Sequence, residues 1–367
     1  MGRRDLPTQP RNSHAASTRD WTHMDQATDV DDVRHVRRAI QLAHGGPAVD
    51  VNPRVGAVVT DITGMVIGEG FHRGAGSPHA EVEALRAAGT AARGGTAYVS
   101  LEPCNHTGRT GPCAEALIAS GVARVVFAQA DPNPRASGGA NRLRATGVQV
   151  TGGVLNDEAS ATNRTWTYRA SNGRPFVTWK FAATLDGRSA ALDGTSRWVT
   201  CAEARADVHA LRSRCGAVIA GTGTVLADDP RLTVRLYNRS TSTQPLRVVI
   251  GERPIPPHAH VLDDEAPTLV LQTHDVSAAM TRLSQAGIHH ALLEGGPTLA
   301  AAFLRAGLVD EVVAYLAPAL LGAGRSALAD LGIGTIADTL RLIPTDVTVL
   351  GTDVRITATP HHHEEGH

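Results

Sequence analysis

Four residues of the chain have the types and spacing of a hydrolytic zinc site. His79 and Glu81 stand two positions apart in SPHAEVEAL, and Cys104 and Cys113 follow in EPCNHTGRTGPC. Imidazole and thiolate are preferred zinc ligands, and three of them leave a fourth tetrahedral position open for water. We predict His79, Cys104 and Cys113 as these ligands, because zinc then lowers the pKa of the bound water. Glu81, which is not a ligand, is the predicted catalytic residue that moves the proton.

The same residues match the signature of nucleobase deaminases, with one departure in spacing. Eight residues rather than two separate Cys104 from Cys113, so the loop 105–112 must bulge between the ligands, where it could contact substrate. A structural zinc site needs a fourth ligand, and His106 lies only two residues from Cys104, a cramped geometry. We therefore expect a catalytic zinc ion that supports hydrolytic removal of an amino group from an aminopyrimidine.

The predicted helices and strands place these residues at element ends. A helix is expected from Asp31, behind an acidic first turn, and another from about His79 to residue 88. The run TAYVSLEPC is typical of a buried strand that ends at Pro103, and a further helix is expected to begin at Cys113. This alternation of strands and helices indicates a sheet sandwiched between helices.

The pattern resets at 169–175, in the polar segment RASNGRP, which we interpret as a linker between two domains. A second α/β set follows, from PFVTWKFAATLDG to VDEVVAYLAP. We predict a disordered extension over 1–28, domains over 29–172 and 173–358, and a polar tail over 359–367. Cys201 and Cys215 fall in or beside a helical stretch and are interpreted as ordinary small residues.

The composition is that of a globular protein, with 42% hydrophobic and 19% charged residues. The formal net charge of −1 argues against a nucleic-acid partner. Apolar runs are too short to span a bilayer, and the basic amino terminus has no apolar segment of the secretory type. We therefore expect a cytoplasmic protein that binds neither membrane nor nucleic acid.

Over about residues 31–355 the chain resembles the bifunctional riboflavin-biosynthesis deaminase–reductases of bacteria. The first half carries NPRVGAVV, HAEVEAL, LEPCNHTGRTGPC and DPNP, and the second carries KFAATLDGR, TSRWVT, TVLADDPRLTVR, EGGPTLAAAFL and DEVVAYLAPALLG. The resemblance implies a cytidine-deaminase-like α/β/α sandwich followed by a dihydrofolate-reductase-like α/β domain. It also implies zinc-dependent deamination of 2,5-diamino-6-ribosylamino-4(3H)-pyrimidinone 5′-phosphate, and then NADPH-dependent reduction of the ribosyl group to ribityl.

The resemblance further implies residues that contact cofactor and substrate. Positions that match NADPH contacts are Ala182, Trp198, Thr224, Asp228, Gly296, Pro297, Thr298 and Leu299. Positions that match substrate contacts are Asn52, Lys180, Ser196, Arg212, Leu232, Arg235 and Glu294. Arginine suits a ribose 5′-phosphate because guanidinium donates parallel hydrogen bonds. Asn52 has a second interpretation, as a turn residue before Pro53. The chain departs from the family where Asp50 and Val51 replace His-Pro.

Two alternatives stay open at the level of sequence. The second domain could be degenerate, which would leave a single-activity aminopyrimidine deaminase, because hydride transfer needs no acid–base residue visible in a sequence. Alternatively, the chain could be a nucleotide-binding regulatory module whose zinc is only structural. We expect the bifunctional enzyme, which acts on a small phosphorylated pyrimidine and assembles as a homo-oligomer.

Overall fold

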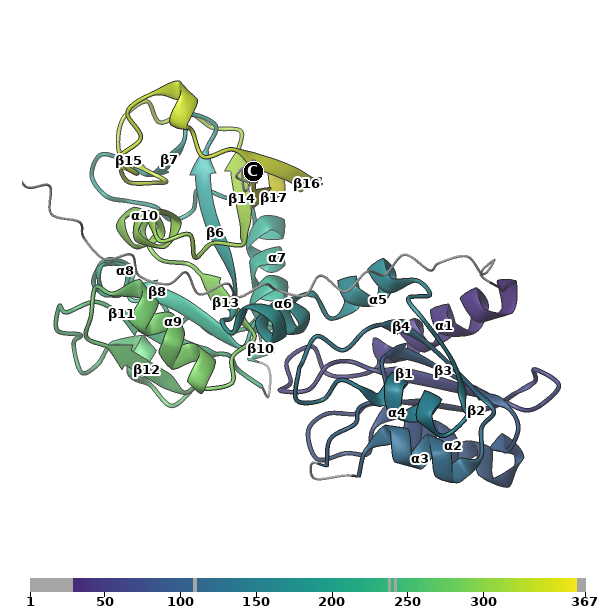
Figure 1. Ribbon diagram of the computed structural model, residues 1–367. Coiled ribbons are helices and arrows are strands. Elements are labelled where there is room, and N and C mark those ends of the chain that lie inside the picture. The colour runs from purple at the N-terminus through teal and green to yellow at the C-terminus, as the bar shows by residue number, and fades with distance from the viewer. Residues whose placement is uncertain (1–28, 108–110, 237–238, 241–242, 362–367) are drawn as a thin grey trace, which may run out of the picture.

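The computed structural model describes residues 29–107, 111–236, 239–240 and 243–361, which form two α/β halves side by side (Figure 1). The first half consists of α1 (Val30–Ala43), β1 (Gly56–Thr60), β2 (Val66–Phe71), α2 (Ala80–Ala88), β3 (Thr96–Leu101), α3 (Cys113–Ser120), β4 (Arg124–Gln129), α4 (Gly139–Ala145), β5 (Gln149–Gly152), α5 (Asn156–Thr162) and α6 (Arg164–Asn172). A short 3-10 turn, Gly89–Ala92, follows α2.

The first half is a three-layer sandwich around a five-stranded sheet in the order β2-β1-β3-β4-β5. β1 runs antiparallel to β2 and β3, whereas β3, β4 and β5 are parallel. One core joins α1 and α5 to one face of the sheet, and Val36, Val58 and Val126 belong to it. A second core joins α2, α3 and α4 to the other face. The expected α/β/α sandwich is confirmed.

The second half consists of β6 (Phe176–Thr184), β7 (Arg188–Ala190), α7 (Ala202–Arg212), β8 (Ala217–Gly221), α8 (Thr222–Asp228), β9 (Arg235–Leu236), β10 (Arg239–Ser240), β11 (Leu246–Ile250), β12 (Thr268–Leu271), α9 (Val276–Gln285), β13 (His290–Leu293), α10 (Pro297–Arg305), β14 (Glu311–Ala317), β15 (Arg325–Ser326), β16 (Leu342–Leu350) and β17 (Asp353–Pro360). Its 3-10 turns are His260–Leu262 and Ile336–Asp338.

An eight-stranded sheet organises the second half, in the order β12-β11-β8-β13-β6-β14-β17-β16. The strands from β12 to β14 are parallel, and β17 and β16 complete the sheet in antiparallel pairing. One core packs α9 and α10 on one face, and another packs α7 on the opposite face. The expected α/β class is confirmed here as well. In this register Lys180 of β6 lies opposite Val313 of β14, so both are on the α7 side of the sheet with Tyr315.

The structure corrects two boundaries. Residues 169–172 are not linker, because α6 continues through Asn172 and ends at Gly173, whose φ is +71°. Tertiary contacts favour the helix over its polar composition: the rings of Tyr168 and Phe176 lie 5.3 Å apart, and Arg169 donates to the carbonyl of Ser284 at 3.0 Å. The predicted tail starts too early, because Thr359 and Pro360 pair with β16.

The predicted disordered extension, 1–28, lies outside the described residues, as do tail residues 362–367. Within the part of the chain that the structure describes, no helix has both the length and the apolar character needed to cross a membrane.

Candidate active sites

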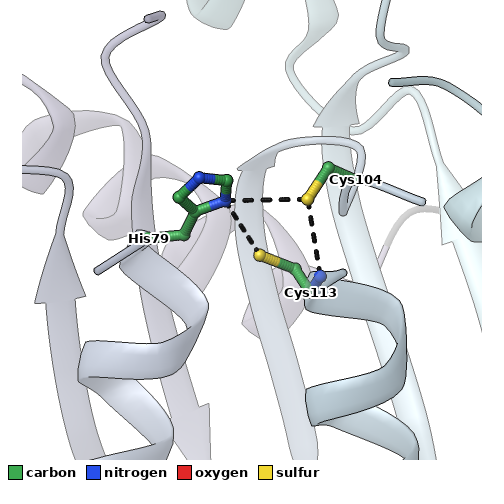
Figure 2. Close-up of side chains that lie close together, drawn as sticks. All are labelled: His79, Cys104 and Cys113. Carbon is green, nitrogen blue, oxygen red and sulfur yellow. Dashed lines mark hydrogen bonds between the residues drawn. The ribbon is translucent and has the colours of Figure 1, made fainter. Parts of the chain in front are cut away.

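The three predicted metal ligands meet at one point in the first half (Figure 2). His79 caps the start of α2, Cys104 follows β3, and Cys113 is the first residue of α3. The Nδ1 atom of His79 lies 3.1 Å from Sγ of Cys113 and 3.6 Å from Sγ of Cys104. All three ligand atoms lie within 4.8 Å of one another. One imidazole and two thiolates form the donor set that zinc prefers.

The protonation of the thiols also suits a metal ion. The contacts with Cys113 and His79 together outweigh the opposing effect of burial and lower the pKa of Cys104 to about 4. The backbone N–H of Cys113 donates to Sγ of Cys104 at 3.4 Å. The shared proton raises the pKa of Cys113. A cation among the three donors stabilises both thiolates and releases that remaining proton. The residues present therefore fit zinc.

Glu81 lies in the first turn of α2 and is only 4% exposed. Burial raises the pKa of its carboxyl, and the negative charge of Cys104 raises it further. A raised pKa makes the carboxylate a stronger proton acceptor than a solvated glutamate, as a group that accepts and returns a proton requires. The position beside the ligand cluster is the one predicted for a proton shuttle.

Asn52 is held in place beside the ligand cluster by His72, a residue that sequence reasoning missed. Nδ1 of His72 donates to the carbonyl of Pro78 at 3.1 Å, so Nε2 accepts from the Asn52 amide nitrogen at 3.1 Å. The rings of His72 and His79 meet edge to face, with centroids 5.5 Å apart. A lone histidine twenty residues from Asn52 carries no sequence signal, because only the folded sheet brings them together.

Asp50, one of the two departures from the family pattern, organises the same loop. One carboxylate oxygen accepts from the backbone N–H of Asn52 at 2.8 Å, and the other accepts from that of Ala75 at 2.9 Å. The loop before β1 is thus tied to the turn after β2. The departure at Asp50 keeps Asn52 in place through hydrogen bonds.

Glu102 ties a second loop to the ligand cluster and was also missed. Its carboxylate accepts from the backbone N–H groups of Asp131 (3.2 Å), Gly138 (3.2 Å) and Ala140 (3.1 Å). These contacts bring DPNP beside the strand end that carries Cys104. Burial raises the pKa of Asp131 to about 6. Residues 108–110 of the loop between the cysteines lie outside the described residues, so its predicted substrate contact stays a prediction.

In the second half, Lys180, Arg212 and Glu294 form one nearly buried charged cluster. Arg212 binds Glu294 through two parallel hydrogen bonds of 2.5 and 2.9 Å, and Lys180 Nζ lies 3.8 Å from the same carboxylate. Burial opposes the ionisation of Glu294, but the charges of Arg212 and Lys180 outweigh it and lower its pKa to about 2. Burial lowers the pKa of Lys180. Three predicted substrate residues are thus brought together.

The two predicted phosphate-binding arginines differ in their partners. The third guanidinium nitrogen of Arg212 donates to the carbonyl of Thr233 at 2.8 Å, so all three nitrogens form hydrogen bonds. Arg235 donates to the Thr233 hydroxyl at 2.9 Å and makes no ion pair with any described residue. Burial lowers the pKa of Arg235, and so does the nearby charge of Arg212. The three nitrogens of Arg212 are therefore used on Glu294 and Thr233, whereas no carboxylate of the described residues pairs with Arg235.

His209 lies between the two arginines and was missed as well. Its Nδ1 accepts from the backbone N–H of Arg235 at 3.2 Å. Burial lowers its pKa to about 4, and the charges of Arg212 and Arg235 act in the same direction. At neutral pH the ring is therefore uncharged, with the proton on Nε2. Its place three residues before Arg212 on α7 was the available signal, because such residues share a helix face.

The predicted cofactor residues of α8 and α10 lie together. The backbone N–H of Gly296 donates to the Thr224 hydroxyl at 3.1 Å. Pro297, Thr298 and Leu299 form the first turn of α10, so the unpaired N–H groups of a helix start lie at this point. A side chain at Gly295 would come within 2.7 Å of Leu299, which explains the glycine. Such a helix start is suited to phosphate.

Ser196 and Trp198 lie on the loop before α7, and Asp228 is the last residue of α8. Trp198 is 70% exposed, and the Arg205 guanidinium stacks 4.6 Å from its ring centroid. Arg197 donates to the carbonyl of Asp228, which ties this loop to the end of α8. Within the described residues, no hydrogen bond or ion pair joins Ser196 to the charged cluster.

Ala182 and Leu232 are placed by the core of the second half. Ala182 lies on β6 opposite Tyr315 and packs against the α7-side core. Leu232 is 3% exposed and belongs to that core, with a φ of +53°. Any contact of Leu232 with substrate must therefore come from its backbone.

Comparisons with known proteins match both halves. The cytidine and deoxycytidylate deaminase zinc-binding region matches residues 30–129, and the RibD C-terminal domain matches 175–356. Riboflavin biosynthesis protein RibD of Mycobacterium tuberculosis is 49% identical over 304 residues, which are 82% of this chain and 89% of that protein. The solved structure of Acinetobacter baumannii RibD has a TM-score of 0.83 and 40% identity, covering 90% of this chain and 99% of that one.

A further solved structure is similar along its whole length. It is a diaminohydroxyphosphoribosylaminopyrimidine deaminase/5-amino-6-(5-phosphoribosylamino)uracil reductase from Thermotoga maritima, with a TM-score of 0.79 and 31% identity. The match covers 90% of this chain and 99% of that one. The two halves therefore occur together, in the same order, in these relatives.

Replacement of Glu81 by Gln tests the proton shuttle. We expect Glu81→Gln to lower the rate of ammonia release by about 10²- to 10⁴-fold, because the amide cannot accept a proton. Zinc content, measured by atomic absorption, should stay at the wild-type level. Cys113→Ser is the matched control and should lose zinc together with activity. Full ammonia release by Glu81→Gln would contradict the assigned role.

Replacement of Glu294 by Gln tests the buried charge cluster. The folded state lowers the Glu294 pKa from 4.5 to about 2, so the carboxylate stabilises the fold fully above pH 4.5. That contribution is lost as the pH falls towards 2. We expect Glu294→Gln to lower the free energy of unfolding by about 3 kcal/mol at pH 7. The difference from wild type in urea unfolding should shrink below pH 4.5, and a difference independent of pH would contradict the argument.

Proposed function

Because the chain belongs to the RibD family of bifunctional deaminase–reductases of riboflavin biosynthesis, we propose the substrates and residue roles of its two reactions. The first half, residues 29–172, deaminates 2,5-diamino-6-ribosylamino-4(3H)-pyrimidinone 5′-phosphate. The second half, from residue 173 to the end of β17, reduces the ribosyl group of the product to ribityl with NADPH. The observation that carries the proposal is the meeting of His79, Cys104 and Cys113 beside buried Glu81.

In the deaminase half, His79, Cys104 and Cys113 would hold zinc, which when bound would supply a water that ionises near neutral pH. Glu81 accepts one proton of this water and returns it to the ring nitrogen, and then carries the second proton, from the hydroxyl on the ring carbon, to the departing amine. The ring carbon gains oxygen, and its bond to nitrogen breaks, so that water and substrate give ammonia and the aminouracil. Asn52, whose amide is oriented by His72, aligns the pyrimidine ring through hydrogen bonds.

In the reductase half, the start of α10 supports the cofactor proposal. Gly296, Pro297, Thr298 and Leu299, with Thr224, hold the phosphates of NADPH, and Ala182, Trp198 and Asp228 lie along the rest of it. Bare backbone at Gly295 and Gly296 and the helix N–H groups fit a dinucleotide phosphate. NADPH, when bound, supplies a hydride, which C1′ of the opened ribose accepts.

The charged cluster orients the substrate of this second reaction. Arg235 binds the 5′-phosphate, with Ser196 and the backbone of Leu232 beside it. Lys180 holds a proton 3.8 Å from Glu294, and burial makes that proton easier to release. Lys180 delivers it to the nitrogen attached to C1′ as the hydride arrives, which balances the charge. Arg212 keeps Glu294 in place for this transfer.

Separate measurement of the two reactions tests the whole proposal. The zinc-loaded chain is incubated with the diaminopyrimidine phosphate, with and without NADPH, at the near-neutral pH of the cytoplasm. We expect ammonia release in both mixtures and the ribityl product only with NADPH. Ammonia release without any reduction would indicate the single-activity deaminase. Neither reaction would indicate the regulatory module with structural zinc.

We also propose a homo-oligomer, supported by the apolar face of β16 at the edge of the larger sheet. Val347 and Val349 are 64% and 71% exposed and pair with Ile356 and Val354 of β17. An exposed edge strand with valines on one face favours association with another copy. Lysine at both positions should lower the mass measured by sedimentation. The control is Ile62→Lys, an exposed apolar position in the first half, and an unchanged mass of the double variant would refute the interface.

A further inference from the structure

A cavity of about 620 Å³ lies where the two halves meet. The first half contributes the loop 47–54 and the junction of α5 and α6, and the second half contributes α7, β14 and β17. Small-molecule sites have volumes of roughly 300 to 1,000 Å³, so the cavity can hold a phosphorylated pyrimidine. Neither proposed reaction takes place in it.

The carboxylates in the cavity wall are already engaged. Glu311 accepts from Arg164 of the first half at 2.6 Å and from Thr178 at 3.0 Å. Arg355 donates to Asp207 and to Asp346, each at 2.9 Å. Asp50, the remaining acid of the wall, accepts hydrogen bonds from the backbone N–H groups of Asn52 and Ala75. These acids therefore have little capacity left to bind a cation.

Two arginines of the wall, one from each half, have no such partner. Neither Arg54 nor Arg214 forms an ion pair with a described residue. Arg54 donates from Nε to the carbonyl of Pro47 at 3.0 Å, and its backbone is held by Asn163 at 2.9 and 2.8 Å. Burial lowers the pKa of Arg54. Arg54 is half-buried and Arg214 is exposed at the cavity wall, and guanidinium groups without a counter-ion favour an anion that accepts several hydrogen bonds, such as phosphate.

The cavity also borders both proposed sites. Asn52 lines it and is bonded to His72, whose ring touches the metal ligand His79. Tyr315 lines it from the other half, and Nζ of Lys180 lies 5.8 Å from the Tyr315 ring centroid. The cavity wall is therefore linked by direct side-chain contacts to both the proposed site that releases the aminouracil and the one that reduces it.

We propose that this cavity binds the phosphorylated aminouracil between the two reactions, with its phosphate against Arg54 and Arg214. The proposal rests on the proposed function, because it needs one reaction to supply the ligand and the other to consume it. Retention in the cavity keeps part of the intermediate from mixing with the solution before it is reduced.

A label-dilution experiment with the zinc-loaded full chain tests this. The enzyme receives isotopically labelled diaminopyrimidine phosphate, NADPH and an excess of unlabelled aminouracil phosphate. We expect the ribityl product of the wild type to carry more label than complete mixing allows. In Arg214→Ala the label should fall to the mixing value, and Arg214→Lys, which keeps the charge, should retain most of the excess.

The control measures each reaction of Arg214→Ala with its own substrate. Arg214 belongs to neither proposed site, so both rates should stay within about twofold of wild type. The proposal would be overturned if the wild-type ribityl product carried only the fraction of label that complete mixing predicts. It would also be overturned if the product of Arg214→Ala carried as much label as that of the wild type. Absence of either separate reaction in the wild type would instead count against the proposed function. Circular dichroism of both variants confirms that they fold.

Discussion

The meeting of three ligand atoms within 4.8 Å is the constraint on which the first half depends. His79 and Cys113 begin helices, so the metal site exists only if α2 and α3 start at the correct places on the sheet. Close packing ensures this for α2: a side chain at Gly70 of β2 would come within 2.5 Å of the Ala80 carbonyl. Because Gly70 has no side chain, α2 packs closely against β2, and this close packing sets the position of His79. Asp50 and Glu102 then tie the surrounding loops to the same strand ends.

Both sites contain a buried carboxylate, and its surroundings decide its chemistry. Glu81 is buried near the negative charge of Cys104, so its pKa rises and it can carry a proton. Glu294 is buried between two cations, so its pKa falls to about 2 and it stays ionised. Burial alone favours the neutral acid, and neighbouring charges either add to that effect or reverse it. The first environment suits a proton shuttle, and the second suits a fixed anion that holds Lys180.

Much of the local structure follows from the sequence, and the failures have one cause. The helix predicted from Cys113 begins there, and the strand predicted to end at Pro103 ends two residues earlier, at Leu101. The segment 169–175 was interpreted as a linker because its residues are polar, yet its first four residues are helical, supported by the contacts of Tyr168 with Phe176 and of Arg169 with Ser284. Arg212, predicted to contact substrate, is also bonded to Glu294, 82 residues away, a partner that no local pattern indicates.

The sequence by itself determined the zinc-binding group and the order of the two halves, and it predicts Glu81 as the proton carrier, because donor type and short-range spacing are local properties. Only the tertiary structure decided which partners those residues have. His72 orients Asn52, Glu102 gathers three backbone N–H groups, and Arg212 holds Glu294. These pairings, like the cavity between the halves, depend on contacts between segments far apart in the chain, which no local pattern encodes.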